Sequence, residues 1–215
     1  MAAKALYWLG SSLEDTRDFP EDARRIAGHQ LHLVQLGLQP DDWKPMPSVG
    51  AGVYELRVHT EVEHRVFYIA KYAEGVYVLH AFEKHAADAA GGRRAGPAAP
   101  GRPGPDPPRG GSREEEGAVM APKITRSSGN VFQDLGFGAD EAEHLRIRSA
   151  LMATLRKLIK DRGLTQAQAA TLFGVSQPRV SDLVRGKIDL FSIDTLVDML
   201  ARAGLHVELV VGQVA

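Results

Sequence analysis

The segment between residues 87 and 119 limits the chain most strongly, because it cannot take part in a hydrophobic core. It consists mainly of Gly, Pro, Ala and Arg, and it has no periodic apolar positions. Gly and Pro oppose both helix and sheet, and so little apolar surface cannot offset the entropy lost on ordering. We therefore predict a disordered linker that divides the 215 residues into two domains, 1–86 and 120–215.

Two origins of this linker are open. A Gly/Pro/Ala/Arg string is what a GC-rich gene yields when it is translated out of frame, and the sequence from Val119 onward reads like the start of a second protein at Met120. Two adjacent genes would then have been joined by a frameshift. The alternative is a linker that evolved as such.

The composition excludes several classes of function. The absence of cysteine excludes disulfides, thiol catalysis and Cys-based zinc sites. A net charge of -1 means that binding to nucleic acid must rest on a local patch. No apolar run reaches membrane-spanning length and the first residues do not form a secretory signal, so we expect a cytoplasmic protein without membrane contacts.

No cofactor and no metal site are indicated. His29 and His32 are three residues apart on one predicted helix, but no acidic ligand supports them. We interpret these histidines as surface or partly packed residues.

Residues 163–187 carry the strongest local signals, for two short helices joined by a tight turn. Thr165 and Gln168 have the spacing of a capping box, and Gly174 can end the first helix in the left-handed conformation. Ser176 caps the second helix, with a proline in its first turn. Apolar side chains fall on one side of the pair and polar ones on the other, which is the division that a helix-turn-helix needs.

The flanking sequence makes the second domain all-α, with one strand at its end. A long amphipathic helix is predicted over 140–162, and another follows Ser192 and ends before Gly204. Residues 205–211, LHVELVV, read as a C-terminal β-strand. Because an isolated strand needs a partner, pairing with the same strand of a second chain would give a homodimer.

The first domain mixes helices and strands. A strand is predicted over 6–9, a short helix over 13–19 and an amphipathic helix over 20–37. The runs VYELRVHT, EHRVFYIAKY and GVYVLHAFEKH then predict three strands with joints short enough for hairpins. The order of strand, two helices and antiparallel meander is that of an α+β domain.

This first domain resembles the RelE/HigB toxin superfamily, in particular its phage Gp49-like branch. The resemblance lies in WKPMPSVGAGVYELRV at 43–58, HRVFYIA at 64–70 and VYVLHAFEKH at 76–85. It implies a ribosome-dependent mRNA endonuclease. Toxins of this branch usually continue with a second Lys and a C-terminal helix, whereas here His85 stands at the Lys position and no helix is predicted. An inactive, truncated toxin is therefore the alternative.

The second domain, with its helix-turn-helix core at 151–205, resembles the Cro/C1-type (XRE) family, and specifically antitoxins of HigA type. In that family the N-terminal segment lies against the toxin, so Val131, Phe132, Leu135 and Phe137 are candidates for this contact. Together the two resemblances imply a fused toxin–antitoxin polypeptide. Its antitoxin half would bind the cognate toxin domain in cis or in trans.

Operator DNA is the partner expected of the second domain. The helix after Ser176 would lie in the major groove, where Gln177 suits adenine and Arg179 suits guanine. Gln166 could hold a phosphate and brace Gln177. The candidate DNA-binding residues are Gln166, Ser176, Gln177, Pro178, Arg179, Ser181, Arg185 and Lys187. The alternative for each of them is a solvated helix face.

mRNA on the ribosome is the partner expected of the first domain. RNA cleavage without a metal requires an activated 2′-OH, a stabilised phosphorane charge and a protonated leaving oxygen. By resemblance, Arg57, Arg65 and Lys84 are assigned to the substrate phosphate and the transition-state charge. His80 and Tyr77 could exchange protons, or could be core residues. The competing interpretation is a DNA-binding repressor whose toxin remnant has lost catalysis.

Overall fold

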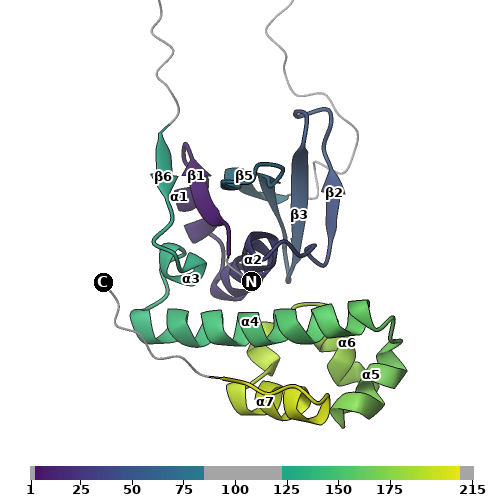
Figure 1. The fold of residues 1–215 in the computed structure, drawn as a ribbon. Helices are drawn as coiled ribbons and strands as arrows, with labels where there is room; N and C mark the ends of the chain where they lie inside the picture. The colour runs from purple at the N-terminus through teal and green to yellow at the C-terminus, as the bar shows by residue number, and fades with distance from the viewer. Residues whose placement is uncertain (1–2, 85–122, 209–215) are drawn as a thin grey trace, which may run out of the picture.

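The computed structural model describes residues 3–84, called the first part here, and 123–208, the second part (Figure 1). The linker predicted over 87–119 and His85 lie outside these ranges. So do residues 209–211 of the predicted C-terminal strand. No helix in the described part of the chain is long and apolar enough to cross a membrane.

The first part has the α+β organisation that the sequence predicts. Its elements in chain order are β1 (Ala5–Leu9), α1 (Ser12–Arg17), α2 (Glu21–Gln35), β2 (Trp43–Pro45), β3 (Val53–His59), β4 (Glu63–Ile69) and β5 (Gly75–Lys84). Only β2 was not predicted, because its three residues lie in a segment dominated by turn signals. Pro45 is tolerated there because β2 is an edge strand, where a missing N–H breaks no ladder.

The strands form one sheet in the order β2-β3-β4-β5-β1-β6. The meander from β2 to β5 is antiparallel, whereas β1 runs parallel to β5, with Trp8 beside Val78. One face of the sheet packs on α2 through buried residues such as Leu56 and Val66, which share a core with Ala27 and Leu31 of the helix. The other face of β3, β4 and β5 points away from α2.

The second part is helical, as predicted. Its elements are β6 (Ile124–Arg126), α3 (Val131–Asp134), α4 (Ala139–Asp161), α5 (Gln166–Phe173), α6 (Gln177–Val184), the 3₁₀ turn η2 (Ile188–Leu190) and α7 (Ile193–Arg202). The capping box of Thr165 and Gln168 is formed, and Gly174 adopts a φ of 65°. Residues 205–208, the start of the predicted C-terminal strand, form neither strand nor helix.

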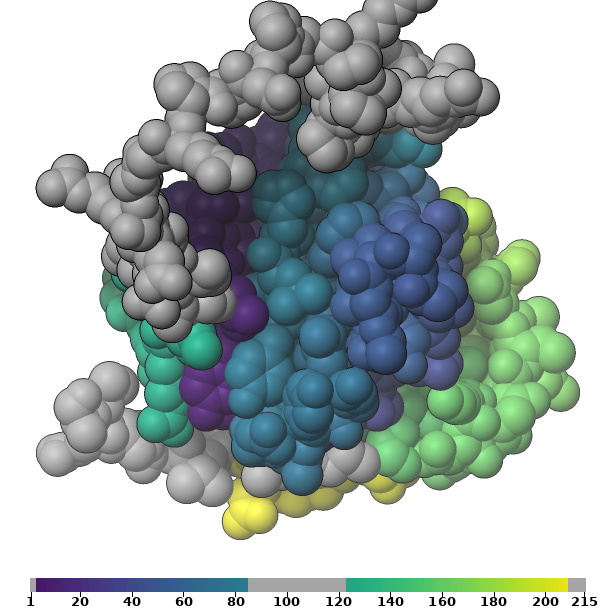
Figure 2. Space-filling view, turned by 90° about the horizontal axis from the view of Figure 1, so that it is seen from above, coloured from purple at the N-terminus to yellow at the C-terminus, as the bar shows by residue number. Residues whose placement is uncertain are grey.

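Strand β6 belongs to the second part but completes the sheet of the first. It lies beside β1 (Figures 1 and 2) and pairs with it antiparallel. Trp8 is the register partner of Thr125. The amide of Gly10 donates to the carbonyl of Lys123 at 2.8 Å, and the amide of Ser127 donates to the carbonyl of Leu6 at 2.9 Å. The backbone groups of β1 at this edge are therefore paired, and the edge is covered.

Helix α3 packs on α2 and extends the core across both parts. The four apolar anchors of this segment, at 131, 132, 135 and 137, are all buried. The ring of Phe132 lies so close to Gly28 that a Cβ built on that glycine would stand 2.7 Å from Phe132 Cε1. One hydrophobic cluster therefore joins the first part to the second.

Enlarging Gly28 should disturb this packing. Gly28→Val would push two methyl groups into Phe132, and overpacking of this kind costs about 1–3 kcal/mol. Valine has a better helix propensity than glycine, so a loss of stability would come from the contact and not from the helix. Thermal unfolding of the full chain measures it.

The matched control is Ala167→Val on the exposed side of α5. It makes a change of similar size in a helix without a buried neighbour, and we expect only the propensity difference of roughly 0.5 kcal/mol. An equal effect of the two substitutions would show that Phe132 does not press on Gly28 in solution.

Candidate functional site

The five residues assigned to RNA cleavage lie on one face of the sheet, the face turned away from α2. Arg57 of β3 stands beside Arg65 of β4, and Lys84 of β5 stands opposite Glu63. His80 and Tyr77 are three residues apart and would face opposite sides of a regular strand. The irregularity of the ladder between Phe67 and Tyr68 places both on the same side.

Carboxylates accompany the two arginines of this face. Glu55 Oε1 lies 3.0 Å from the Nε atoms of both Arg57 and Arg65. Arg65 also contacts Glu63 at 2.8 Å, and Arg57 contacts Asp42 at 3.5 Å. The hydrogen bond to Glu55 raises the pKa of Arg57 above its ordinary value. Both guanidinium groups are held in place, and a phosphate would have to compete with these carboxylates.

The two proton-exchange candidates differ in their surroundings. The side chain of His80 is 54% exposed, stacks on Phe82 and has Nδ1 at 3.0 Å from Asp15 Oδ2. A histidine that is oriented by a carboxylate and open to solvent has the geometry of a general base or acid. Tyr77 stacks on Tyr7 with ring centroids 5.0 Å apart, in a cluster of aromatic rings.

The helix-turn-helix presents part of the predicted DNA-binding set to solvent. Ser176, Gln177 and Pro178 are exposed at the start of α6. Gln177 Nε2 donates to Gln166 Oε1 at 3.5 Å, which is the brace that the sequence suggested. The guanidinium of Arg179 lies 4.5 Å from the centre of the Phe191 ring. Ser181 is half-buried on the same helix.

A buried polar cluster links α2 with α4. Ser149 Oγ of α4 lies 2.8 Å from His29 Nδ1 and 2.7 Å from His32 Nδ1. A hydroxyl donates one hydrogen bond and accepts others, so two neutral imidazoles satisfy it, one as donor and one as acceptor. Burial lowers the pKa of His29 well below its ordinary value and lowers that of His32 to about 4. The prediction that these histidines lie at the surface or are partly packed is wrong.

Ion pairs surround this cluster. Arg156 of α4 contacts Asp41 at 2.6 Å, and each side chain is only 16% exposed. Burial raises the pKa of Asp41 to about 6 and lowers that of Arg156. On the other side, Arg25 contacts Glu141 at 2.6 Å and Asp189 at 3.4 Å. These contacts hold α4 and η2 of the second part against α2.

The loop after α6 also lies on the first part. Gly186 has a φ of 68°, and a Cβ there would stand 2.5 Å from Asp41 Oδ2. Arg185 and Lys187, two DNA-binding candidates, line a cavity of about 390 Å³ together with Arg57 and His59 of the sheet. Lys187 is also paired with Asp182 at 2.9 Å. The structure thus brings cations of both predicted sites to one cavity, which the sequence did not indicate.

Two family models match the chain. Residues 14–90 match the family of the phage derived protein Gp49-like, and residues 131–212 match a helix-turn-helix domain. No curated protein matches the chain at a significant level. The two matches follow one another in the order that the sequence predicts, and the chain has a fused toxin–antitoxin arrangement. Among residues 3–84 and 123–208, no group of three His, Asp or Glu side chains could hold a metal ion.

Acid should weaken the α2–α4 contact. The folded-state pKa values of His29 and His32 lie below the unfolded value of about 6.5, so the unfolded chain binds protons first, and stability falls as the pH drops from there toward 4. Asp41 acts in the opposite direction, because its raised pKa favours proton uptake by the folded chain below about pH 6. The stability lost through the two histidines exceeds the stability gained through Asp41, so acid lowers the free energy of unfolding.

Urea unfolding at about pH 7 and about pH 5 tests this expectation, with His32→Gln expected to remove up to about 2 kcal/mol of the acid-induced loss. The control is His144→Gln, at an exposed histidine of α4. The same acid sensitivity in both variants would contradict a role for the buried imidazole.

Proposed function

We propose that this fusion of a Gp49-like domain with a helix-turn-helix domain is a toxin–antitoxin polypeptide that restrains its own toxin half. The proposal rests on two contacts between the parts: β6 of the second part pairs with β1 of the first, and Phe132 is fully buried against α2. An antitoxin segment that supplies a strand and core side chains to the toxin binds it through both backbone and apolar contacts. Binding in cis needs no second chain, although the same contacts could form in trans.

The second part would act as an autorepressor of the XRE, HigA-like type in the cytoplasm. The exposed start of α6, with Gln177 braced by Gln166, supports insertion into the major groove of operator DNA. Arg179 of α6 lies against the ring of Phe191, the residue after η2, and from there it can reach a guanine. A homodimer would present two copies of α6 to the half-sites of a palindromic operator.

The first part would be a ribosome-dependent mRNA endonuclease. Arg57, Arg65 and Lys84 stand on three adjacent strands of one face, which suits the charge of a phosphate in the transition state. His80, oriented by Asp15, is our choice for proton transfer. Arg185 and Lys187 line the same cavity as Arg57, so the second part stands at the edge of this face.

One observation favours the alternative of a repressor with an inactive toxin remnant. Both arginines of the face are paired with carboxylates, and Glu55 is shared between them. If these pairs persist when RNA binds, the positive charge needed at the phosphate is largely cancelled. Growth arrest on release of the toxin half distinguishes the endonuclease from the repressor with an inactive remnant.

Arg179→Ala should relax the sequence preference of operator binding and weaken it by about 1–3 kcal/mol, because a bidentate contact to guanine is lost. A gel-shift titration against operator and scrambled DNA measures both effects. The control is Arg146→Ala, which removes an arginine paired with Glu143 on α4. Equal affinity and equal preference in the two variants would remove Arg179 from the site.

Phe132→Asp should release the toxin half, since an unpaired carboxylate cannot be buried in the core without a cost of several kcal/mol. We expect growth arrest on induction, with mRNA cut in the ribosomal A site, and rescue by adding Arg65→Ala. The control is Val49→Asp, the same new residue at a position outside β6 and α3 that is 51% exposed.

Normal growth and intact mRNA would contradict the endonuclease, provided that the Phe132→Asp chain still accumulates and binds operator DNA. That outcome would leave the repressor as the function.

A further inference from the structure

A second cavity lies on the opposite face of the sheet from Arg57 and Arg65. It has a volume of about 290 Å³ and lies between the end of α2, the loop before β2 and the strands β3 and β4. Tyr54 and Tyr68 are paired across these strands, and they point toward α2 because they alternate with Glu55 and Phe67. This site is therefore separate from the candidate cleavage face.

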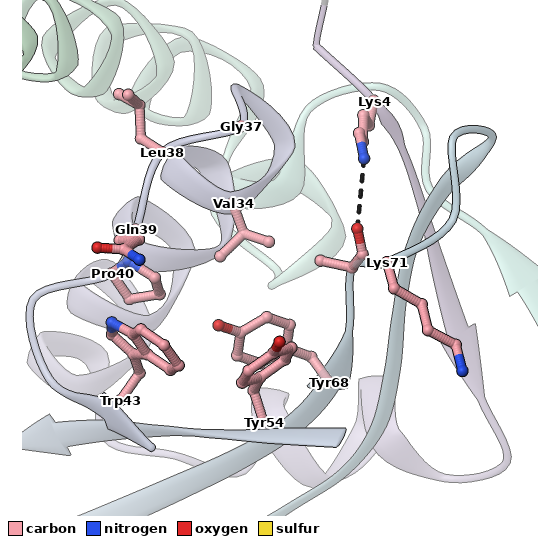
Figure 3. Close-up of a pocket in the computed structure, with 11 residues that line it drawn as sticks. Lys4, Val34, Gly37, Leu38, Gln39, Pro40, Trp43, Tyr54, Tyr68 and Lys71 are labelled. Atoms are coloured by element: carbon pink, nitrogen blue, oxygen red, sulfur yellow. Dashed lines mark hydrogen bonds between the residues drawn. The ribbon is translucent and has the colours of Figure 1, made fainter. Parts of the chain in front are cut away.

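Three aromatic side chains form one wall of the cavity (Figure 3). The Trp43 and Tyr54 rings meet edge to face at 5.2 Å, and the Tyr54 and Tyr68 rings are tilted at 5.7 Å. Val34 and Pro40 lie across from them. A wall of this kind offers flat apolar surfaces to a planar ring.

Polar atoms within this wall lack partners. Tyr68 is only 3% exposed, yet its hydroxyl makes no hydrogen bond to any residue in the described ranges, and Figure 3 shows it directed into the cavity. The Trp43 indole N–H and the Tyr54 hydroxyl are likewise without a partner among residues 3–84 and 123–208. The Tyr68 hydroxyl is not among the enclosed unpaired atoms of the described residues, so it is accessible from the cavity and can donate or accept a hydrogen bond with a polar ligand.

One lysine adds positive charge at one end of the cavity. Lys4 Nζ donates to the carbonyl of Ala70 at 3.3 Å and to that of Tyr72 at 3.0 Å. The Lys71 side chain points away from the aromatic wall, and its ammonium donates to the carbonyl of Ala51 at 3.2 Å, outside the cavity lining (Figure 3). Within the part of the chain that the structure describes, Lys4 has no carboxylate within ion-pair distance, so its charge favours an anionic group on the ligand.

We propose that this cavity binds the base and phosphate of a nucleotide. The base would stack on the Tyr54 ring beside Trp43, its edge would exchange hydrogen bonds with the Tyr68 hydroxyl, and the phosphate would lie toward Lys4. Stacking on aromatic side chains accepts every base, so the site has little base preference. The proposal does not depend on RNA cleavage or on operator binding.

Titration of the full chain with nucleoside 5′-monophosphates tests the site. Binding is measured by calorimetry and by tryptophan fluorescence. Trp8 is fully buried, so a ligand-dependent change reports Trp43. We expect saturable binding that Tyr54→Leu weakens about fivefold or more, because a stacking surface is lost. Tyr68→Phe and Lys4→Gln should also weaken it, and Tyr68→Phe keeps the packing, so it remains informative if Tyr54→Leu does not fold.

The matched controls are Tyr7→Phe on the opposite face and Lys160→Gln on α4, both of which should bind like the unsubstituted chain. A short RNA that binds more tightly than the mononucleotide would identify RNA as the source of the ligand, and equal binding would identify the free nucleotide. The proposal is overturned if neither binds at millimolar concentrations, or if Tyr54→Leu and Tyr68→Phe leave binding unchanged.

Discussion

The burial of the 131–137 segment against α2 is the interaction on which the rest of the structure depends. Gly28 leaves room on α2 for the Phe132 ring, and the backbone of β6 covers the edge of β1 beside it. Burying a phenylalanine side chain contributes about 1.5–3 kcal/mol, and covering the edge removes a site for aggregation. Without this segment, the first part would expose an apolar helix face and an unpaired strand edge.

The polar contacts around this core determine how the second part is oriented. Ser149 is placed to pair with the Nδ1 atoms of two buried imidazoles, and Arg156 to pair with the buried Asp41. Removing one partner would leave an unpaired polar group or charge, so these contacts select one arrangement of α4 on α2. That arrangement places the loop of Gly186 next to Asp41, and it links the DNA-binding half to the edge of the candidate cleavage face.

The sequence predicted the features that depend on neighbouring residues. The capping box at Thr165, the left-handed Gly174 and most element boundaries follow from signals within a few residues. Strands β2 and β6 were missed because three residues carry no periodicity, and β6 is defined by a partner more than 100 positions away. The same holds for His29 and His32, whose burial depends on Ser149. His80 and Tyr77 lie on the same face of the sheet because of a register shift in the ladder, and no local sequence signal predicts that shift.

Hydrogen exchange at the amides of Gly10 and Ser127 tests most directly whether the second part is docked on the first. Each amide donates to a carbonyl of the other part, at 2.8 Å and 2.9 Å. A docked chain predicts that both exchange as slowly as the amides of β4 and β5, because opening them requires the parts to separate. Fast exchange at Gly10 and Ser127, with β4 and β5 still protected, would contradict the account.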